Sequence, residues 1–271
     1  GELTYPAERI GLDDAAGFLD GAERPLVIVG AGALARPDGA AVLAKARALA
    51  TVTDEWNGFG VLHVAASRVG GLDLGFVPGE GGRDVEGILA GVEAGEVDTV
   101  YLLAADEIDT SRLKGAFVIY QGAMGDAGAH AADVILPGAA YTEKDAIYVN
   151  TEGRVQRAFR SVFPPGDGRE DWAILRALSG ALDKTLPFND LHQLRQAMTA
   201  ACPVLAEIDV QGPGAWGTFG VEGAIDAAPF RPAVQNFYMT DPISRASQTM
   251  AKCMAELGAS AGAEERTEAH A

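Results

Sequence analysis

Short apolar runs alternate with longer, alanine-rich segments along the first half of the chain, and this rhythm limits the fold more than any other feature. Helices are predicted over 38–50, with Asp38 as the N-cap, and over 84–94, ending near Gly95. Strand and helix in alternation predict an α/β fold with a doubly wound, mostly parallel sheet. The runs with the length and composition of buried strands are 26–30 (LVIVG), 99–104 (TVYLLA), 117–121 (FVIYQ) and 133–136 (DVIL).

The second half of the chain has a different pattern. Residues 147–155 predict two extended pieces around a turn of Asn and Gly, and 169–183 predicts an amphipathic helix. A further helix is expected over 189–201, followed by a Gly/Pro-rich stretch, 203–232, that we expect to lie over another surface. A last helix is predicted over 241–257, because an Asp and a Pro begin it and a Gly follows it.

Charge and hydropathy exclude several classes of function. The formal net charge is −17, so phosphate backbones and anionic lipid headgroups would repel the chain. We therefore expect no nucleic-acid partner and no direct membrane insertion. The longest apolar stretch, 59–79, carries three charged or ionisable side chains and does not have the roughly 20 apolar residues of a spanning helix. The sequence begins with Gly1 and shows no secretory signal, which we interpret as processing or as a piece of a longer protein.

Metal-ligand patterns are sparse. Cys202 and Cys253 are the two cysteines, fewer than the four ligands of a structural zinc or an iron–sulfur cluster. The four histidines have no metal-ligand spacing. We expect buried thiols and no metal, and a loop-positioning role for His130.

One enzymatic motif follows the first predicted strand. Gly30, Gly32 and Ala35 fit G-x-G-x-x-A, and Asp54 and Glu55 follow at the distance of a ribose-binding acid, as in nicotinamide sites. Pro37 argues against this reading, because a proline here interrupts the helix that should receive the pyrophosphate. The favoured interpretation is that these small residues only form the turn between a strand and a helix. Nicotinamide binding stays open as the other interpretation.

Residues 132–159 (ADVILPGAAYTEKDAIYVNTEGRVQRAF) resemble a motif of the molybdopterin-oxidoreductase superfamily, and 164–182 (PPGDGREDWAILRALSGAL) resembles the helix that follows it. The wording LPGAAYTEK…YVNTEGR, with 237–253 (FYMTDPISRASQTMAKC), is similar to the large iron–sulfur subunits of respiratory complex I. The resemblance implies a molybdopterin-oxidoreductase-like α/β domain at 1–185 that has lost its cofactor. An irregular extension with a docking helix would follow at 186–257. Residues 258–271 are small, charged and aperiodic, and this composition predicts a disordered tail.

The same resemblance implies a structural role in NADH:quinone oxidoreductase rather than catalysis by this segment. No cofactor is expected here, since the iron–sulfur clusters of the family lie in an N-terminal, cysteine-rich part. The implied partners are other peripheral-arm subunits, on the cytoplasmic side of a bacterial inner membrane or on the matrix side of the mitochondrial one. The alternatives are a catalytic molybdopterin enzyme fragment and a nicotinamide-binding domain. A capped amphipathic helix after an extended arm suits docking, and the interface residues that we predict are Phe237, Tyr238, Asp241, Ile243 and Arg245.

Overall fold

The computed structural model describes residues 22–53, 55–212, 216–228, 230, 234 and 236–257. The chain divides into two compact units. Unit 1 comprises Gly1–Val64 with Gly214–Ala233, and unit 2 comprises Ala65–Pro213 with Val234–Ala271. The predicted tail, 258–271, lies outside the described residues. The predicted organisation into 1–185 and 186–257 stays a prediction.

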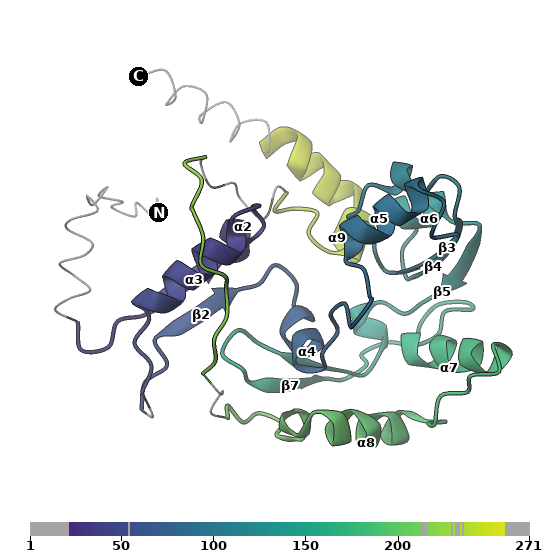
Figure 1. The fold of residues 1–271 in the computed structure, drawn as a ribbon. Helices are drawn as coiled ribbons and strands as arrows, with labels where there is room; N and C mark the ends of the chain where they lie inside the picture. Colours follow the sequence, from purple (N-terminus) through teal and green to yellow (C-terminus); the bar gives the residue numbers. More distant parts are fainter. Residues whose placement is uncertain are drawn as a thin grey trace. The chain divides into compact units, whose positions relative to one another are not determined.

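Unit 1 contains two parallel strands, and two helices lie between them in the sequence (Figure 1). Strand β1 (Val27–Gly30) pairs with β2 (Phe59–Leu62), and between them lie α2 (Ala31–Leu34) and α3 (Gly39–Leu49). Strand β1 and helix α3 confirm the sequence prediction to within a residue or two. Strand β2 was not predicted, because it is short and contains Gly60, a residue that is depleted in strands.

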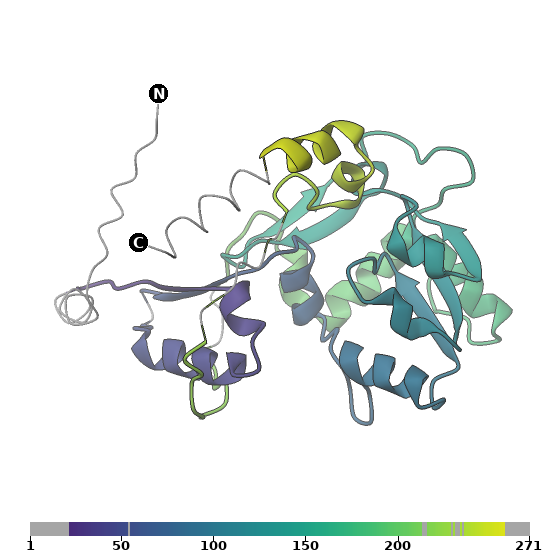
Figure 2. The same ribbon diagram turned by 90° about the horizontal axis from the view of Figure 1, so that it is seen from above.

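The Gly/Pro-rich segment 216–228 runs beside α3, in agreement with the predicted role of that stretch (Figures 1 and 2). The Val221 N–H donates to the Ala40 carbonyl at 3.0 Å. Gly220 has a φ of +77°, and a Cβ at that position would lie 2.5 Å from the Ala44 nitrogen. Close approach and the left-handed backbone both require glycine there.

Asp38 precedes α3 as predicted, but its side chain does not cap the helix. The carboxylate instead accepts two hydrogen bonds from the Arg36 guanidinium, at 2.7 and 2.9 Å, and one from the Asp226 N–H at 2.7 Å. Arg36 also donates to the carbonyl oxygens of Asp226 and Ala228. The ion pair thus ties the start of α3 to the Gly/Pro-rich segment.

Replacing Asp38 with asparagine is expected to remove the part of the acid sensitivity of unit 1 that comes from this carboxylate. The Arg36 hydrogen bond, and after it the Asp226 N–H, hold the Asp38 pKa at about 2, below the ordinary 3.8. A lowered pKa means that this stabilisation is present above pH 4 and is lost as the pH falls towards 2. Urea midpoints followed by tryptophan fluorescence in a Trp172→Phe background, which leaves Trp56 and Trp216 of unit 1 as reporters, measure the effect. The prediction would be contradicted if the urea midpoints of the wild type and the variant differed by the same amount at pH 5 and at pH 2.

Unit 2 contains two further sheets. Strands β3, β4 and β5 form a parallel sheet in that order, and β6 and β7 form an antiparallel pair. The elements of unit 2 are α4 (Arg68–Asp73), α5 (Val85–Glu93), β3 (Thr99–Leu103), η1 (Thr110–Leu113), β4 (Phe117–Gly122), α6 (Ala127–Ala131), β5 (Val134–Pro137), η2 (Tyr141–Glu143), β6 (Ala146–Val149), β7 (Val155–Ala158), α7 (Asp171–Ala181), α8 (Leu191–Ala201), η3 (Pro203–Ala206) and α9 (Pro242–Arg245).

These elements confirm the α/β class with parallel sheets, and they confirm the strands, the hairpin and the helices that were predicted between residues 84 and 201. The strands that the structure describes fall into three sheets, and the doubly wound arrangement stays a prediction. In the part of the chain with described coordinates, no helix combines the length and the apolar character that crossing a membrane requires.

The larger core of unit 2 lies between α5 and the parallel sheet. Val100 and Leu102 of β3 are buried while their neighbours in the strand are more exposed, as the two-residue period of a strand requires. The buried members of this core are Leu89, Val92, Val100, Leu102, Leu113, Val118 and Tyr120. A smaller core of Val149, Val155 and Leu205 joins the hairpin to η3.

The predicted terminal helix is in fact two helices. Helix α9 ends at Arg245, and a second helix covers 248–257 (Figure 2). Ser247 lies at the break, where its hydroxyl accepts from the Met250 N–H at 3.3 Å and its carbonyl accepts from the Ala251 N–H at 3.0 Å. A serine that caps a new helix in this way competes with continuation of the first.

Candidate interaction site around Arg245

Local hydrogen bonds fix the single turn of α9. The Asp241 carboxylate accepts from the N–H groups of Ile243 and Ser244, at 3.0 and 3.2 Å, and from the Ser244 hydroxyl at 2.7 Å. Pro242 occupies the first turn, where its missing N–H costs nothing. The Ser244 hydrogen bond, followed by the backbone N–H groups, lowers the pKa of Asp241. These hydrogen bonds therefore position the side chain of the last residue of the turn.

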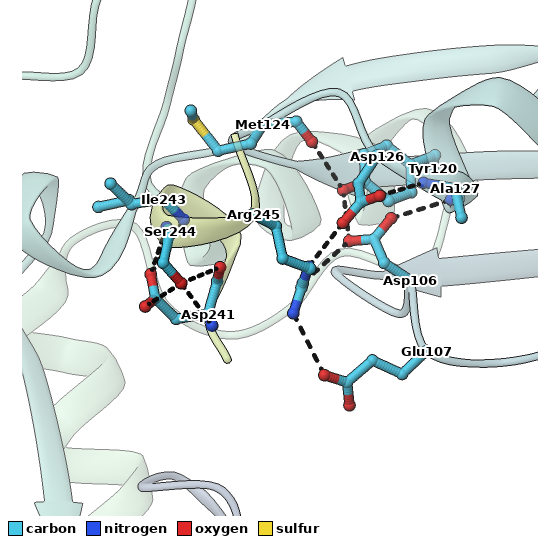
Figure 3. Close-up of polar contacts among 11 residues, drawn as sticks. Asp106, Glu107, Tyr120, Met124, Asp126, Ala127, Asp241, Ile243, Ser244 and Arg245 are labelled. Atoms are coloured by element: carbon cyan, nitrogen blue, oxygen red, sulfur yellow. Dashed lines mark hydrogen bonds and ion pairs between the residues drawn. The ribbon is translucent and has the colours of Figure 1, made fainter. Parts of the chain in front are cut away.

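That side chain, Arg245, points from α9 into a cluster of three carboxylates, Asp106, Glu107 and Asp126, here called the acidic nest (Figure 3). Its Nε donates to Asp126 Oδ2 at 2.6 Å, and its Nη1 donates to Glu107 Oε1 at 3.2 Å. Its Nη2 lies 3.9 Å from Asp106 Oδ2. The guanidinium holds the C-terminal segment against the loops around α6 and after β3.

Asp106 extends this contact into the core. Its side chain is almost fully buried and accepts from the Tyr120 hydroxyl at 3.0 Å and from the Gly128 N–H at 2.9 Å. Burial, and then the hydrogen bond to Asp106, raise the pKa of Tyr120 above its ordinary value. The phenol therefore stays neutral and acts as a donor. A Cβ at Gly128 would lie 2.7 Å from the Tyr120 ring, so glycine is required for this packing.

The residues predicted as an interface differ in their exposure and in their contacts within the chain. Asp241 and Arg245 bond within unit 2, and Tyr238 and Ile243 are partly buried. Phe237 is 81% exposed. The contacts seen here are all within one chain, so the predicted interface with another protein stays a prediction.

The acidic nest was not predicted. Its members lie in two loops twenty residues apart, among many other carboxylates, and no spacing in the sequence singles them out. A weak signal existed in Asp126, which precedes a short Gly/Ala-rich helix as an N-cap residue and accepts from the Ala127 N–H at 2.8 Å. Only the fold brings its other oxygen to Arg245.

A second polar cluster lies near the carboxyl ends of β3 and β4, the edge at which parallel sheets bind ligands. Gln121 is fully buried and donates to Asp171 Oδ1 at 2.9 Å, while the Tyr101 hydroxyl donates to Gln121 Oε1. Lys144 donates to the other carboxylate oxygen of Asp171. Burial, and then the Asp171 charge, raise the pKa of Tyr101. The polar groups of these side chains therefore form hydrogen bonds with one another.

The structure gives little support to the other candidate sites from the sequence, a nicotinamide site and a metal site. Gly30 is extended and the helix after it is a single turn, while a separate helix begins at Gly39, as the position of Pro37 predicts. Asp54 lies outside the described residues. Among the residues with described coordinates, no group of three or more His, Cys, Asp or Glu is arranged to hold a metal ion.

Comparison with protein families gives two matches in sequence order. Residues 16–181, more than half of the chain, match the model for molybdopterin oxidoreductase. Residues 216–253 match the model for the C-terminal region of an NADH-ubiquinone oxidoreductase subunit. The second match contains α9 and its arginine.

Curated relatives agree with both matches. The NADH-ubiquinone oxidoreductase 75 kDa subunit of Reclinomonas americana is 40% identical over 93% of this chain and 38% of its own length. The NADH dehydrogenase [ubiquinone] iron-sulfur protein 1 of Solanum tuberosum is 42% identical over 88% of this chain and 32% of its own. The 78 kDa subunit of the Candida albicans enzyme is 42% identical over 88% and 34%. The chain thus spans about a third of the length of these relatives.

Proposed function

Because this chain belongs to the molybdopterin oxidoreductase family, we propose that it is a structural part of the large iron–sulfur subunit in the peripheral arm of a proton-pumping NADH:quinone oxidoreductase. The order of the two family matches is the observation that carries this proposal, because the second match names a subunit of that enzyme and covers the segment that α9 anchors. Electrons from NADH to quinone would pass through other parts of the assembly. This part would hold those parts in position.

The proposal includes the loss of the pterin cofactor that the ancestral fold held. The polar side chains at the carboxyl edge of β3 and β4 do not fit a pterin, because Gln121, Asp171 and Lys144 already bond one another there. In this view 1–185 is a doubly wound domain without its cofactor, 186–257 is an irregular extension, and the clusters lie in another part of the subunit.

The proposed partners are other subunits of the peripheral arm. The place would be the cytoplasmic side of a bacterial inner membrane, or the matrix side in a mitochondrion. Phe237, Tyr238, Asp241, Ile243 and Arg245 remain the proposed contact segment, with distinct tasks. The exposed Phe237 ring would contact the neighbour, while Arg245 and Asp241 would hold the segment in position.

Native electrophoresis tests this function. Full-length protein carrying an affinity tag should co-migrate with NADH:quinone oxidoreductase activity, and elemental analysis of the purified complex should find iron without stoichiometric molybdenum. Co-migration with a different oxidoreductase, or one molybdenum per subunit, would instead favour a working molybdopterin enzyme.

A further inference from the structure

One stretch of this acidic chain is basic. Between Glu152 and Asp167, residues 153–166 hold three arginines and no acidic residue, a charge of +3. Since the whole chain carries −17, the remainder carries −17 − 3 = −20. The stretch comprises two residues of the turn before β7, the whole of β7 and the loop after it, and it also contains exposed aromatic rings.

Two of the arginines lie over these rings. The Arg157 guanidinium carbon is 4.4 Å from the centre of the Phe159 ring, and that of Arg160 is 4.2 Å from the centre of the Phe163 ring. Phe159 is 67% exposed and Phe163 is 76% exposed. We name these four residues the Arg–Phe edge. Stacking on a ring holds a guanidinium in a defined plane and leaves its N–H groups at the rim.

Both guanidinium groups retain capacity for a further anion. Arg160 donates to Glu170 at 3.3 Å, and Arg157 lies 3.5 Å from Asp145. Each guanidinium has five N–H donors, and the two side chains remain 35% and 38% exposed. The edge therefore presents oriented donors to solvent beside uncovered apolar surface.

An open hollow of about 480 Å³ adjoins the edge. Phe163 lies at it together with Trp172, Ala173 and Leu191 of helices α7 and α8. The charged residues of the lining are Arg160, Arg169, Asp145 and Glu170. A hollow with apolar lining and a charged rim suits one apolar side chain flanked by carboxylates.

We propose that the Arg–Phe edge docks an acidic segment of a partner protein, whose carboxylates bind Arg157 and Arg160 and whose apolar side chain enters the hollow. This proposal rests on the proposed function, since it names a surface by which the chain would hold a neighbouring subunit. Charge complementarity decides the occupant. An extended anionic surface, whether lipid or nucleic acid, would also meet the −20 of the remaining chain. A narrow segment meets mainly the residues around the hollow, where Arg157, Arg160 and Arg169 outnumber the carboxylates of Asp145 and Glu170.

Peptide titration tests the docking directly. The probes are three short labelled peptides: one rich in Asp and Glu with a central Leu, the same peptide with Ser in place of Leu, and a charge-reversed version with Lys. Fluorescence anisotropy with the purified chain should show the first peptide binding tightest and the Lys version not binding. Arg157→Gln with Arg160→Gln should weaken the first peptide about tenfold, and Phe163→Ala should abolish the advantage of Leu over Ser.

Matched controls exist on the same chain. Arg68→Gln removes an exposed arginine, and Phe76→Ala removes an exposed ring, both outside the edge, so both should bind as the wild type does. Equal binding of the acidic and the Lys peptide, an unchanged affinity in the double variant, or displacement of the peptide by dilute inorganic phosphate or phosphatidylserine vesicles would overturn the proposal. Because the titration uses the isolated chain, it fails independently of co-migration with the respiratory complex.

Discussion

Replacing Asp106 with alanine is expected to lower the free energy of unfolding by about 3 kcal/mol. The carboxylate is buried and accepts from the Tyr120 hydroxyl and the Gly128 N–H, and it faces Arg245. Its removal leaves the buried Gly128 N–H without this acceptor, leaves the Tyr120 hydroxyl with the Met124 carbonyl alone, and takes one charge from the acidic nest. Chemical denaturation of the wild type and the variant measures the difference.

Glu107 provides the matched control. It belongs to the same acidic nest and contacts the same arginine at 3.2 Å, but it is 79% exposed. Glu107→Ala should cost less than about 1 kcal/mol, because exposed ion pairs contribute little. If the two alanine variants were equally stable, Asp106 would not be the structural link that its hydrogen bonds indicate.

Replacing Tyr120 with alanine should destabilise the chain by about 4 kcal/mol. The ring is 2% exposed and belongs to the larger core, so its loss leaves a cavity beside Gly128 in addition to the missing hydrogen bond to Asp106. Tyr120→Phe separates the two effects. It retains the ring and removes the hydroxyl, and it should cost about 1 kcal/mol.

Thermal and urea unfolding of both Tyr120 variants check this prediction, with Tyr141→Ala as a control on a half-exposed ring. The control should stay within about 0.5 kcal/mol of the wild type. A Phe variant as unstable as the Ala variant would mean that the hydroxyl, rather than the packing of the ring, dominates at this position.

Elements with local signals were predictable from the sequence. Helix α5 begins where Asp84 accepts from the Gly87 N–H at 2.8 Å, and it is followed by Gly95 with a φ of +71°. Both features can be read from residue types within the element itself. The hairpin of β6 and β7 is similar, since the Asn150 side chain accepts from two N–H groups of its own turn.

Elements that depend on distant partners were not predictable. Strand β2 forms because it pairs with β1 some thirty residues earlier, and its own four residues give a weak signal. The break after α9 depends on whether Ser247 caps a new helix or continues the old one, and propensity alone does not decide between these.

The candidate site lies between these cases. Asp241 and Arg245 were predicted as interface residues, which stays a prediction, and the N-cap role of Asp241 was predicted from its position before Pro242. The target of Arg245 was not predicted, because Asp106 and Asp126 approach it only through the packing of β4 and α6. A long-range ion pair between common residue types has no pattern in one sequence.

The measurement that tests the structural role most directly separates assembly from turnover. In the intact respiratory complex, Phe237→Ala combined with Arg245→Ala should lower the amount of assembled enzyme several-fold, while quinone reduction per assembled complex stays unchanged. Lys252→Ala, an exposed change in the helix over 248–257, should alter neither quantity. A normal amount of assembled complex with a lower turnover would contradict a structural role and place this segment in the chemistry.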